Sequence, residues 1–278
     1  TLPADVATAA AAYSLRKVKA SYSGDAVRVR RVTDDAEVNV AFDSDNKVST
    51  SSLISVVSGT VIGTTLGDFL SQYHSGEALT VHTWYDQAGS NNAVQETDAN
   101  QPTIALSGVL LADGLLFDDS NDFLQSSSQV LTGTTNNSIY CVVKTLADNG
   151  YIAGSAGTGV GMSIYAGSTK FILSNNNSAG TTTQDTIPMV NNQTVLVSAN
   201  FDDGTTDSLH FNSNANGYAN GSSSYSITAG TKFTIGARDG STAEAVMYKG
   251  SIQEVIAYDS FQGANRFKIE SNINNYYG

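Results

Sequence analysis

Residues 194–212, TVLVSANFDDGTTDSLHFN, hold two short runs of apolar and β-branched residues on either side of a turn rich in Asp, Gly and Thr. Runs of this kind, bounded by turn residues, are typical of paired antiparallel strands. From residue 104 onward similar runs recur: GLLFDDSNDFLQ (114–125), SIYCVVKTL (138–146), GMSIYAGSTKFILSN (161–175), GTKFTIGARDG (230–240) and AVMYKGSIQEVIAYD (245–259). The regular spacing predicts an all-β fold, a sandwich of two antiparallel sheets with jelly-roll or Greek-key order.

Three segments are predicted to be peripheral helices. Residues 4–22 are rich in alanine and place apolar side chains at roughly helical spacing. Residues 64–74 are predicted to form a short helix, and residues 261–278 a last helix against an edge of the sandwich. Because the chain has no linker, low-complexity tract or fixed-period repeat, we expect residues 1–278 to form a single domain.

The charge and composition of the chain indicate which kinds of partner it can bind. Lys and Arg total 14 against 26 Asp and Glu, so the net charge is −12 and nucleic acid is an unfavourable partner. No apolar run approaches the ~20 residues that span a bilayer, so membrane insertion is not expected. The single cysteine, Cys141, excludes an intrachain disulfide and a multi-cysteine metal site.

The amino-terminal end shows no cleavable signal and begins at Thr1, as expected of a processed chain or of a piece of something longer. An acidic surface suits a salty or extracellular setting. We therefore expect an extracellular or virion-surface location.

Six of the 14 basic residues fall within sixteen positions: Arg16, Lys17, Lys19, Arg28, Arg30 and Arg31. This cluster suggests an anion-binding patch. The favoured interpretation is that the cations pair with nearby acids, which are Asp25, Asp34, Asp35 and Glu37.

The only tryptophan lies in TWYDQAGSNNAVQ, residues 83–95. An aromatic face with carboxylate and amide neighbours can form a ligand platform, but the same residues can be structural. Strict alternation along 78–87 places Val81, Thr83 and Tyr85 on one face of a strand, and His82, Trp84 and Asp86 on the other.

Two stretches resemble known families. Residues 250–278, GSIQEVIAYDSFQGANRFKIESNINNYYG, and residues 194–221 resemble concanavalin A-like or laminin-G-like sandwich domains. Residues 11–31 followed by 83–95 resemble the catalytic domain of the arabinofuranosidase B family, whose front half recurs in marine phage structural proteins and bacterial surface proteins. The resemblance implies a concanavalin A-like jelly roll.

The resemblance makes YDQAG, residues 85–89, a family-wide turn. Asp86 and Gln87 are then expected to hold the turn through backbone hydrogen bonds. Trp84 differs from the family's aliphatic residue. Because large aromatic residues are usually buried, we expect Trp84 in the core.

The resemblance also supplies candidate site residues. The family's acid/base aspartate falls on Asp239, its nucleophilic glutamate on Asn177, and a substrate-binding aspartate on Asn175. No Asp or Glu lies between positions 151 and 184, and an amide cannot form a glycosyl-enzyme ester. The family's adjacent cysteine pair is also missing. What remains is a predicted sugar-binding set without the chemistry: Asn175, Asn177, Arg238, Asp239 and Tyr165.

The turn at residues 118–122 offers oxygen ligands that could hold calcium: Asp118, Asp119, Asn121 and Asp122. Side chains hydrogen-bonded to the turn backbone are the favoured alternative. No other cofactor is predicted.

The sequence therefore predicts a non-enzymatic carbohydrate-binding or structural module, from a phage virion appendage (fibre, tail or decoration) or a secreted surface protein. Its partners would be a glycan or cell-surface polysaccharide and other virion or surface proteins, with a homo-oligomer compatible. The alternative is a divergent glycoside hydrolase of arabinofuranosidase type. A third interpretation is a purely structural fibre or decoration module.

Overall fold

The computed structural model describes residues 1–72, 77–132, 136–146, 150–156, 161–166, 170–176, 182–188, 191–201, 208–212, 218–219, 227, 229–238 and 247–278. The strands of the first half are β1 (Ala11–Ser14), β2 (Val27–Arg31), β3 (Glu37–Val40), β4 (Ile54–Ser58), β5 (Ala78–Trp84), β6 (Ala93–Val94), β7 (Thr103–Leu106), β8 (Val109–Leu110), β9 (Leu115–Asp118) and β10 (Leu124–Ser126). Those of the second half are β11 (Asn137–Thr145), β12 (Gly150–Ala156), β13 (Gly161–Ala166), β14 (Lys170–Asn176), β15 (Thr182–Pro188), β16 (Thr194–Phe201), β17 (Ser208–Phe211), β18 (Tyr218–Ala219), β19 (Thr234–Ile235) and β20 (Lys249–Tyr258). The helices are α1 (Pro3–Val6), α2 (Leu66–Ser71), α3 (Arg266–Tyr277) and the 3-10 helix η1 (Asp98–Asn100).

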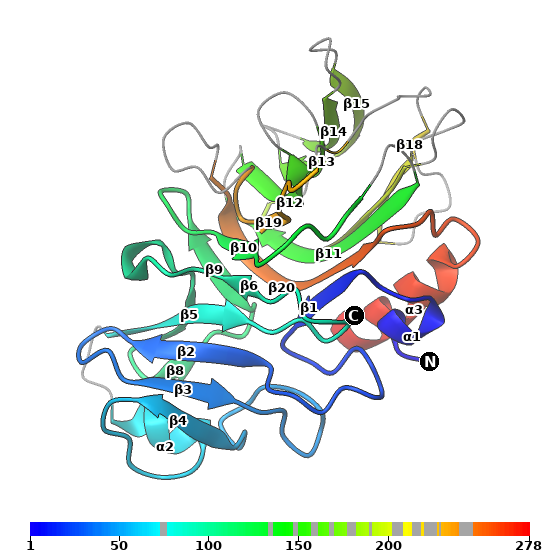
Figure 1. Ribbon diagram of the computed structural model, residues 1–278. Helices are drawn as coiled ribbons and strands as arrows, with labels where there is room; N and C mark the ends of the chain where they lie inside the picture. The colour runs from blue at the N-terminus through cyan, green and yellow to red at the C-terminus, as the bar shows by residue number, and fades with distance from the viewer. Residues whose placement is uncertain are drawn as a thin grey trace.

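Strand β20 organises the sheet. It pairs with β11 along one edge, and with β9 and then β1 along the other. Beyond β11 the order continues through β16, β17 and β18, while β5 joins β2, β3 and β4 on one side and β7 on the other. All these pairings are antiparallel, and the all-β prediction is confirmed (Figure 1).

The main core lies between the sheet layers. It gathers fully buried side chains from strands far apart in sequence, including Val29, Trp84, Phe117, Cys141 and Val255. Burial of apolar area on this scale is the dominant favourable term in folding. The alternating runs of the sequence therefore fold because each strand turns one apolar face toward this shared interior.

The prediction of a helix over residues 4–22 is wrong. Only α1 is helical there, and Ala11–Ser14 forms strand β1, which pairs with β20. All four residues of β1 are buried: Ala11 and Tyr13 face the main core, whereas Ala12 belongs to a second cluster with Ile269 and Ile273 of α3. Burial on both faces overrides the helix propensity of alanine.

The other two helices form where they were predicted. Helix α2 begins after a capping box, in which the Thr65 side chain accepts from the Asp68 amide and the Asp68 carboxylate accepts from the Thr65 amide. Helix α3 packs over the sheet rather than against its edge. Its Ile269 and Ile273 cover apolar side chains that β1, β11, β16 and β20 turn away from the main core. In Figure 1 α1 and α3 lie together near both chain ends.

Because of a β-bulge, the side chains of β5 face different sides of the sheet from those predicted. Thr83 pairs with Arg28 and Val81 with Val29, so His82 is an extra residue without a partner on β2. The bulge reverses the alternation, and Trp84 shares the core face with Val81 instead of a face with His82. Trp84 is fully buried, as predicted.

No helix among the described residues is long and apolar enough to cross a membrane.

Candidate functional site

The strand order brings three predicted site segments onto one sheet. Strands β19, β12, β13 and β14 are neighbours in that order. Tyr165 lies on β13, Asn175 on β14, and Arg238 follows β19. Asn177 and Asp239 lie outside the described residues. The segments that carry Tyr165, Asn175 and Arg238 therefore lie on one sheet, although they are up to 73 positions apart in the chain. Strand β12 separates β13 from β19, and Tyr165 and Asn175 lie three positions apart along the ladder of β13 and β14.

The segment that leads to Arg238 is held closely from both sides. The Gly236 amide donates to the Ile152 carbonyl at 2.9 Å, and the Gly236 carbonyl accepts from the Tyr248 amide at 2.9 Å. Gly236 has φ +86°, and a Cβ there would lie 2.3 Å from the Phe117 ring. Only glycine satisfies both conditions, so this turn fixes where the chain enters the candidate site.

A buried carboxyl stands beside this segment. Strand β10 pairs with β19, Leu124 opposite Ile235, so the preceding Asp122 lies alongside residues 236–238. Asp122 is only 6% exposed. Burial, with a smaller contribution from the Asp118 carboxylate, raises the pKa of Asp122 to about 8. A carboxyl that keeps its proton at neutral pH can donate a hydrogen bond or a proton, a role that the sequence did not suggest.

This pKa predicts a pH-dependent stability. In the folded chain Asp122 stays protonated up to about pH 8, whereas the unfolded carboxyl ionises near 3.8. The folded state therefore binds more protons between these values, and the Asp122 contribution to stability falls as pH rises through them. We expect Asp122→Asn to stabilise the protein on the order of 2 kcal/mol at pH 9 and much less at pH 4.

Urea unfolding of both proteins at pH 4, 7 and 9 measures this effect. Asp119→Asn, at an exposed neighbouring position, is the matched control. Equal pH dependence in the wild type and Asp122→Asn would contradict the assignment.

The turn at 118–122 is held by its own hydrogen bonds. The Asp118 carboxylate accepts from the Ser120 amide at 2.8 Å and from the Asn121 amide at 3.3 Å. Among the residues that the structure describes, no three His, Cys, Asp or Glu side chains gather as metal ligands would. Calcium at Asp118, Asp119, Asn121 and Asp122 stays a prediction.

Asp86 is structural, as predicted. Its carboxylate accepts from the amides of Ala88 at 2.8 Å and Asn91 at 3.0 Å, which shape the turn, and from the Ala12 amide at 2.9 Å. Asp86 is 1% exposed. The motif thus joins the turn after β5 to strand β1.

Gln87 acts on a different segment from the one predicted. Its side-chain oxygen accepts from the Val18 amide at 2.8 Å, and its nitrogen donates to the carbonyls of Ser14 at 3.1 Å and Arg16 at 2.9 Å. These bonds fix the chain that follows β1 rather than the turn itself. They satisfy backbone groups that would otherwise be buried without partners.

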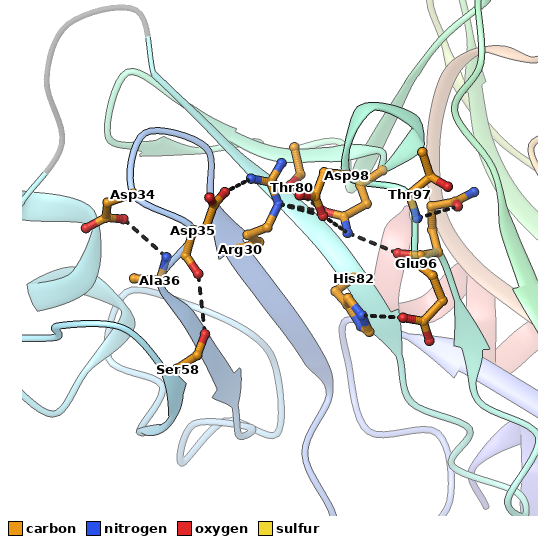
Figure 2. A network of polar contacts seen from close by, with 12 residues as sticks. Arg30, Asp34, Asp35, Ala36, Ser58, Thr80, His82, Glu96, Thr97 and Asp98 are labelled. Atoms are coloured by element: carbon orange, nitrogen blue, oxygen red, sulfur yellow. Dashed lines mark hydrogen bonds and ion pairs between the residues drawn. The ribbon is translucent and has the colours of Figure 1, made fainter.

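The basic cluster is neutralised largely as predicted. Arg30 pairs with Asp35 at 2.6 Å and Arg31 with Asp34 at 2.6 Å. Figure 2 shows Arg30 between Asp35 and Asp98. Its neighbour Val29 faces the core, so Arg30 lies on the opposite, polar face of β2. Arg16 instead reaches Glu254 on β20, a partner 238 positions away that sequence proximity could not suggest.

The bulged His82 points to the same polar face. Its Nε2 lies 3.5 Å from the Glu96 carboxylate, and its Nδ1 lies 2.8 Å from the Thr83 hydroxyl (Figure 2). Glu96 is largely exposed, so this pair contributes little to stability.

Comparison with solved structures places this architecture among known folds. A variant of GH54 α-L-arabinofuranosidase soaked with 4-nitrophenyl α-L-arabinofuranoside superposes with a TM-score of 0.65 and 13% identity. A GH54 α-L-arabinofuranosidase soaked with a cyclic sulfate inhibitor superposes with a TM-score of 0.66 and 12% identity. Both alignments cover 100% of this chain.

These proteins share one β-sandwich fold. The present chain spans 66% of the length of each of these relatives, and at 12–13% identity the likeness concerns the fold alone. No protein-family model matches the sequence, and no curated protein matches it significantly.

Proposed function

We propose that the chain is a non-enzymatic, concanavalin A-like module that binds carbohydrate or serves a structural role. Its setting would be a phage virion appendage or a secreted surface protein. The observation that supports the proposal is that the segments bearing Tyr165, Asn175 and Arg238 lie on one sheet, within the strand order β19, β12, β13, β14. Asn177 and Asp239 complete the proposed site.

The chemistry of this set suits sugar hydroxyls. Amides both donate and accept hydrogen bonds, a guanidinium donates in a fixed fork, and a carboxylate accepts. Tyr165 adds an aromatic ring of the kind that stacks on sugar faces. Such groups hold a glycan without breaking it.

The same set of residues lacks one of the two carboxyl groups that glycoside hydrolysis requires. Retaining glycosidases use two carboxyls about 5 to 5.5 Å apart, one as the nucleophile and one as the acid/base. Residues 151–184 contain no carboxylate, so the resemblance supplies Asp239 as acid/base and no nucleophile. One carboxyl can protonate a leaving group, but by itself it does not activate the attacking group.

Asp122 favours a second candidate function. It is a buried carboxyl with a raised pKa beside the segment that leads to Asp239. In a divergent arabinofuranosidase-type hydrolase, the two carboxyls would share the catalytic roles.

Glycan binding is the first test. A glycan array followed by calorimetric titration of the best ligand should give binding that falls about tenfold in Arg238→Ala, because a ligand hydrogen bond to a cation is lost. Lys249→Ala removes an exposed cation on β20 as the matched control and should leave binding unchanged. Equal binding in wild type and Arg238→Ala would contradict the site, and a blank array would contradict the carbohydrate-binding function.

Turnover of 4-nitrophenyl α-L-arabinofuranoside separates the two candidates. We expect none. Turnover abolished by both Asp239→Asn and Asp122→Asn would establish the hydrolase instead.

A further inference from the structure

A pocket of about 230 Å³ lies where two strands meet end to end along β20. Strand β9 pairs with Lys249–Ile252, and β1 pairs with residues 254–257 on the same edge. Gln253 is the residue between them. The gap between β9 and β1 opens the sheet edge at this one position, and the pocket occupies it.

Gln253 is also a bulge residue. On the other edge of β20, Ile252 pairs with Val143 and Glu254 with Val142, so Gln253 has no partner on β11. Its side chain is partly buried, lines the pocket and makes no hydrogen bond within the described part of the chain. Bulges re-aim side chains and are common next to binding sites. A partly buried carboxamide without a protein partner is a ready ligand group.

The loop before β9 closes one wall of the pocket. Gly114 has φ +89°, and a Cβ there would lie 2.5 Å from the Ile252 carbonyl oxygen and 2.9 Å from the Gln253 Cα. The loop backbone therefore packs directly against the backbone of β20, and any side chain larger than that of glycine at position 114 would clash.

The carboxyl-terminal end of α3 supplies an aromatic wall. Tyr276 is 47% exposed, and the Arg16 guanidinium lies 4.7 Å from its ring centroid. Arg16 is itself fixed, because Glu254 accepts two of its hydrogen bonds at 2.7 and 2.9 Å and Asn272 accepts a third at 2.9 Å. This cation–π contact holds the Tyr276 ring in place.

The pocket is close to electroneutral. The charge of Arg16 is balanced by Glu254, and the ammonium of Lys47, which also lines the pocket, lies 3.4 Å from Asp45. The chain as a whole carries −12 and repels anions. A neutral ligand is therefore favoured over a carboxylate or phosphate.

We propose that this pocket binds one neutral monosaccharide unit, with its ring against Tyr276 and its hydroxyls on the Gln253 carboxamide and the Lys47 ammonium. The volume is below the roughly 300–1,000 Å³ of pockets for drug-sized ligands, so it suits a single sugar ring. This inference rests on the proposed function only for the class of ligand, a sugar. None of the residues that line the pocket belongs to the proposed site around Arg238.

Saturation-transfer NMR with L-arabinose, D-galactose and D-glucose, and with acetate as an anion probe, tests the pocket. We expect at least one sugar to bind the wild type and acetate not to. Gln253→Ala should weaken sugar binding about tenfold, the cost of one lost ligand hydrogen bond. Ala112→Trp fills the pocket from its exposed rim and should abolish binding without disturbing the core. Ala99→Trp, exposed and outside the pocket, is the matched control.

The two proposals fail separately. Sugar binding that is lost in Arg238→Ala but unchanged in Gln253→Ala and Ala112→Trp overturns the pocket and leaves the proposed function standing. Binding that persists in Arg238→Ala and disappears in Ala112→Trp supports the pocket. Acetate binding, or no sugar bound by the wild type, also overturns it.

Discussion

Replacing Trp84 with alanine is expected to lower the free energy of unfolding by about 3 to 5 kcal/mol. The side chain is fully buried, and its ring centroid lies 6.1 Å from that of Tyr13 on β1. Strand β5 also holds Trp84 between Val27 of β2 and Ala93 of β6. Because sheet backbones on both sides prevent the site from collapsing, truncation leaves a cavity. Urea denaturation with a linear extrapolation to water measures the loss.

Trp84→Phe is the matched control. Within the described part of the chain no group accepts a hydrogen bond from the indole nitrogen of Trp84, so phenylalanine removes volume without breaking a hydrogen bond seen in the structure. We expect this variant to lose clearly less stability than Trp84→Ala. If the denaturation midpoint of Trp84→Ala hardly moved while glycan binding vanished, Trp84 would be a ligand platform and the core assignment would be wrong.

The all-β fold could be predicted because its signal is local. Each strand carries its own alternation and turn residues, as residues 194–212 do, and α2 carries its own capping box. The helix prediction over residues 4–22 is wrong because the structure there depends on a distant part of the chain. Ala11 and Ala12 are good helix formers, and what makes them a strand is pairing with β20 at the far end of the chain. No local pattern contains that partner.

Bulges explain the other errors of detail. Period-two alternation assigns faces only while the ladder is regular, and the bulge at His82 moves Trp84 to the core face. The bulge at Gln253 likewise places its carboxamide in the wall of a pocket, which no sequence pattern predicts. The sequence marks Asp122 as a turn residue and a candidate calcium ligand but not as a buried acid, because its position beside residues 236–238 depends on the pairing of β10 with β19.

Glu254→Ala is expected to destabilise the protein by about 3 to 5 kcal/mol. Glu254 is completely buried and accepts hydrogen bonds from Arg16, Ser14 and Tyr277, and Arg16 is 4% exposed. Removing the carboxylate leaves a buried guanidinium without its counter-charge, and desolvation makes that state costly. Chemical denaturation of the variant measures the cost.

A double substitution separates two contributions to the stability loss: the cost of burying Arg16 without a counter-charge, and the favourable interaction between Arg16 and Glu254. If the penalty comes from burying Arg16 alone, Arg16→Met with Glu254→Leu should lose much less stability than the sum of the single substitutions, because no uncompensated charge remains. Additive losses would show instead that the two side chains act independently. The same double variant removes the guanidinium that lies over the Tyr276 ring and lines the pocket beside Gln253. We therefore expect it to fold and yet to bind a sugar more weakly in that pocket, a combination that lost stability alone would not produce.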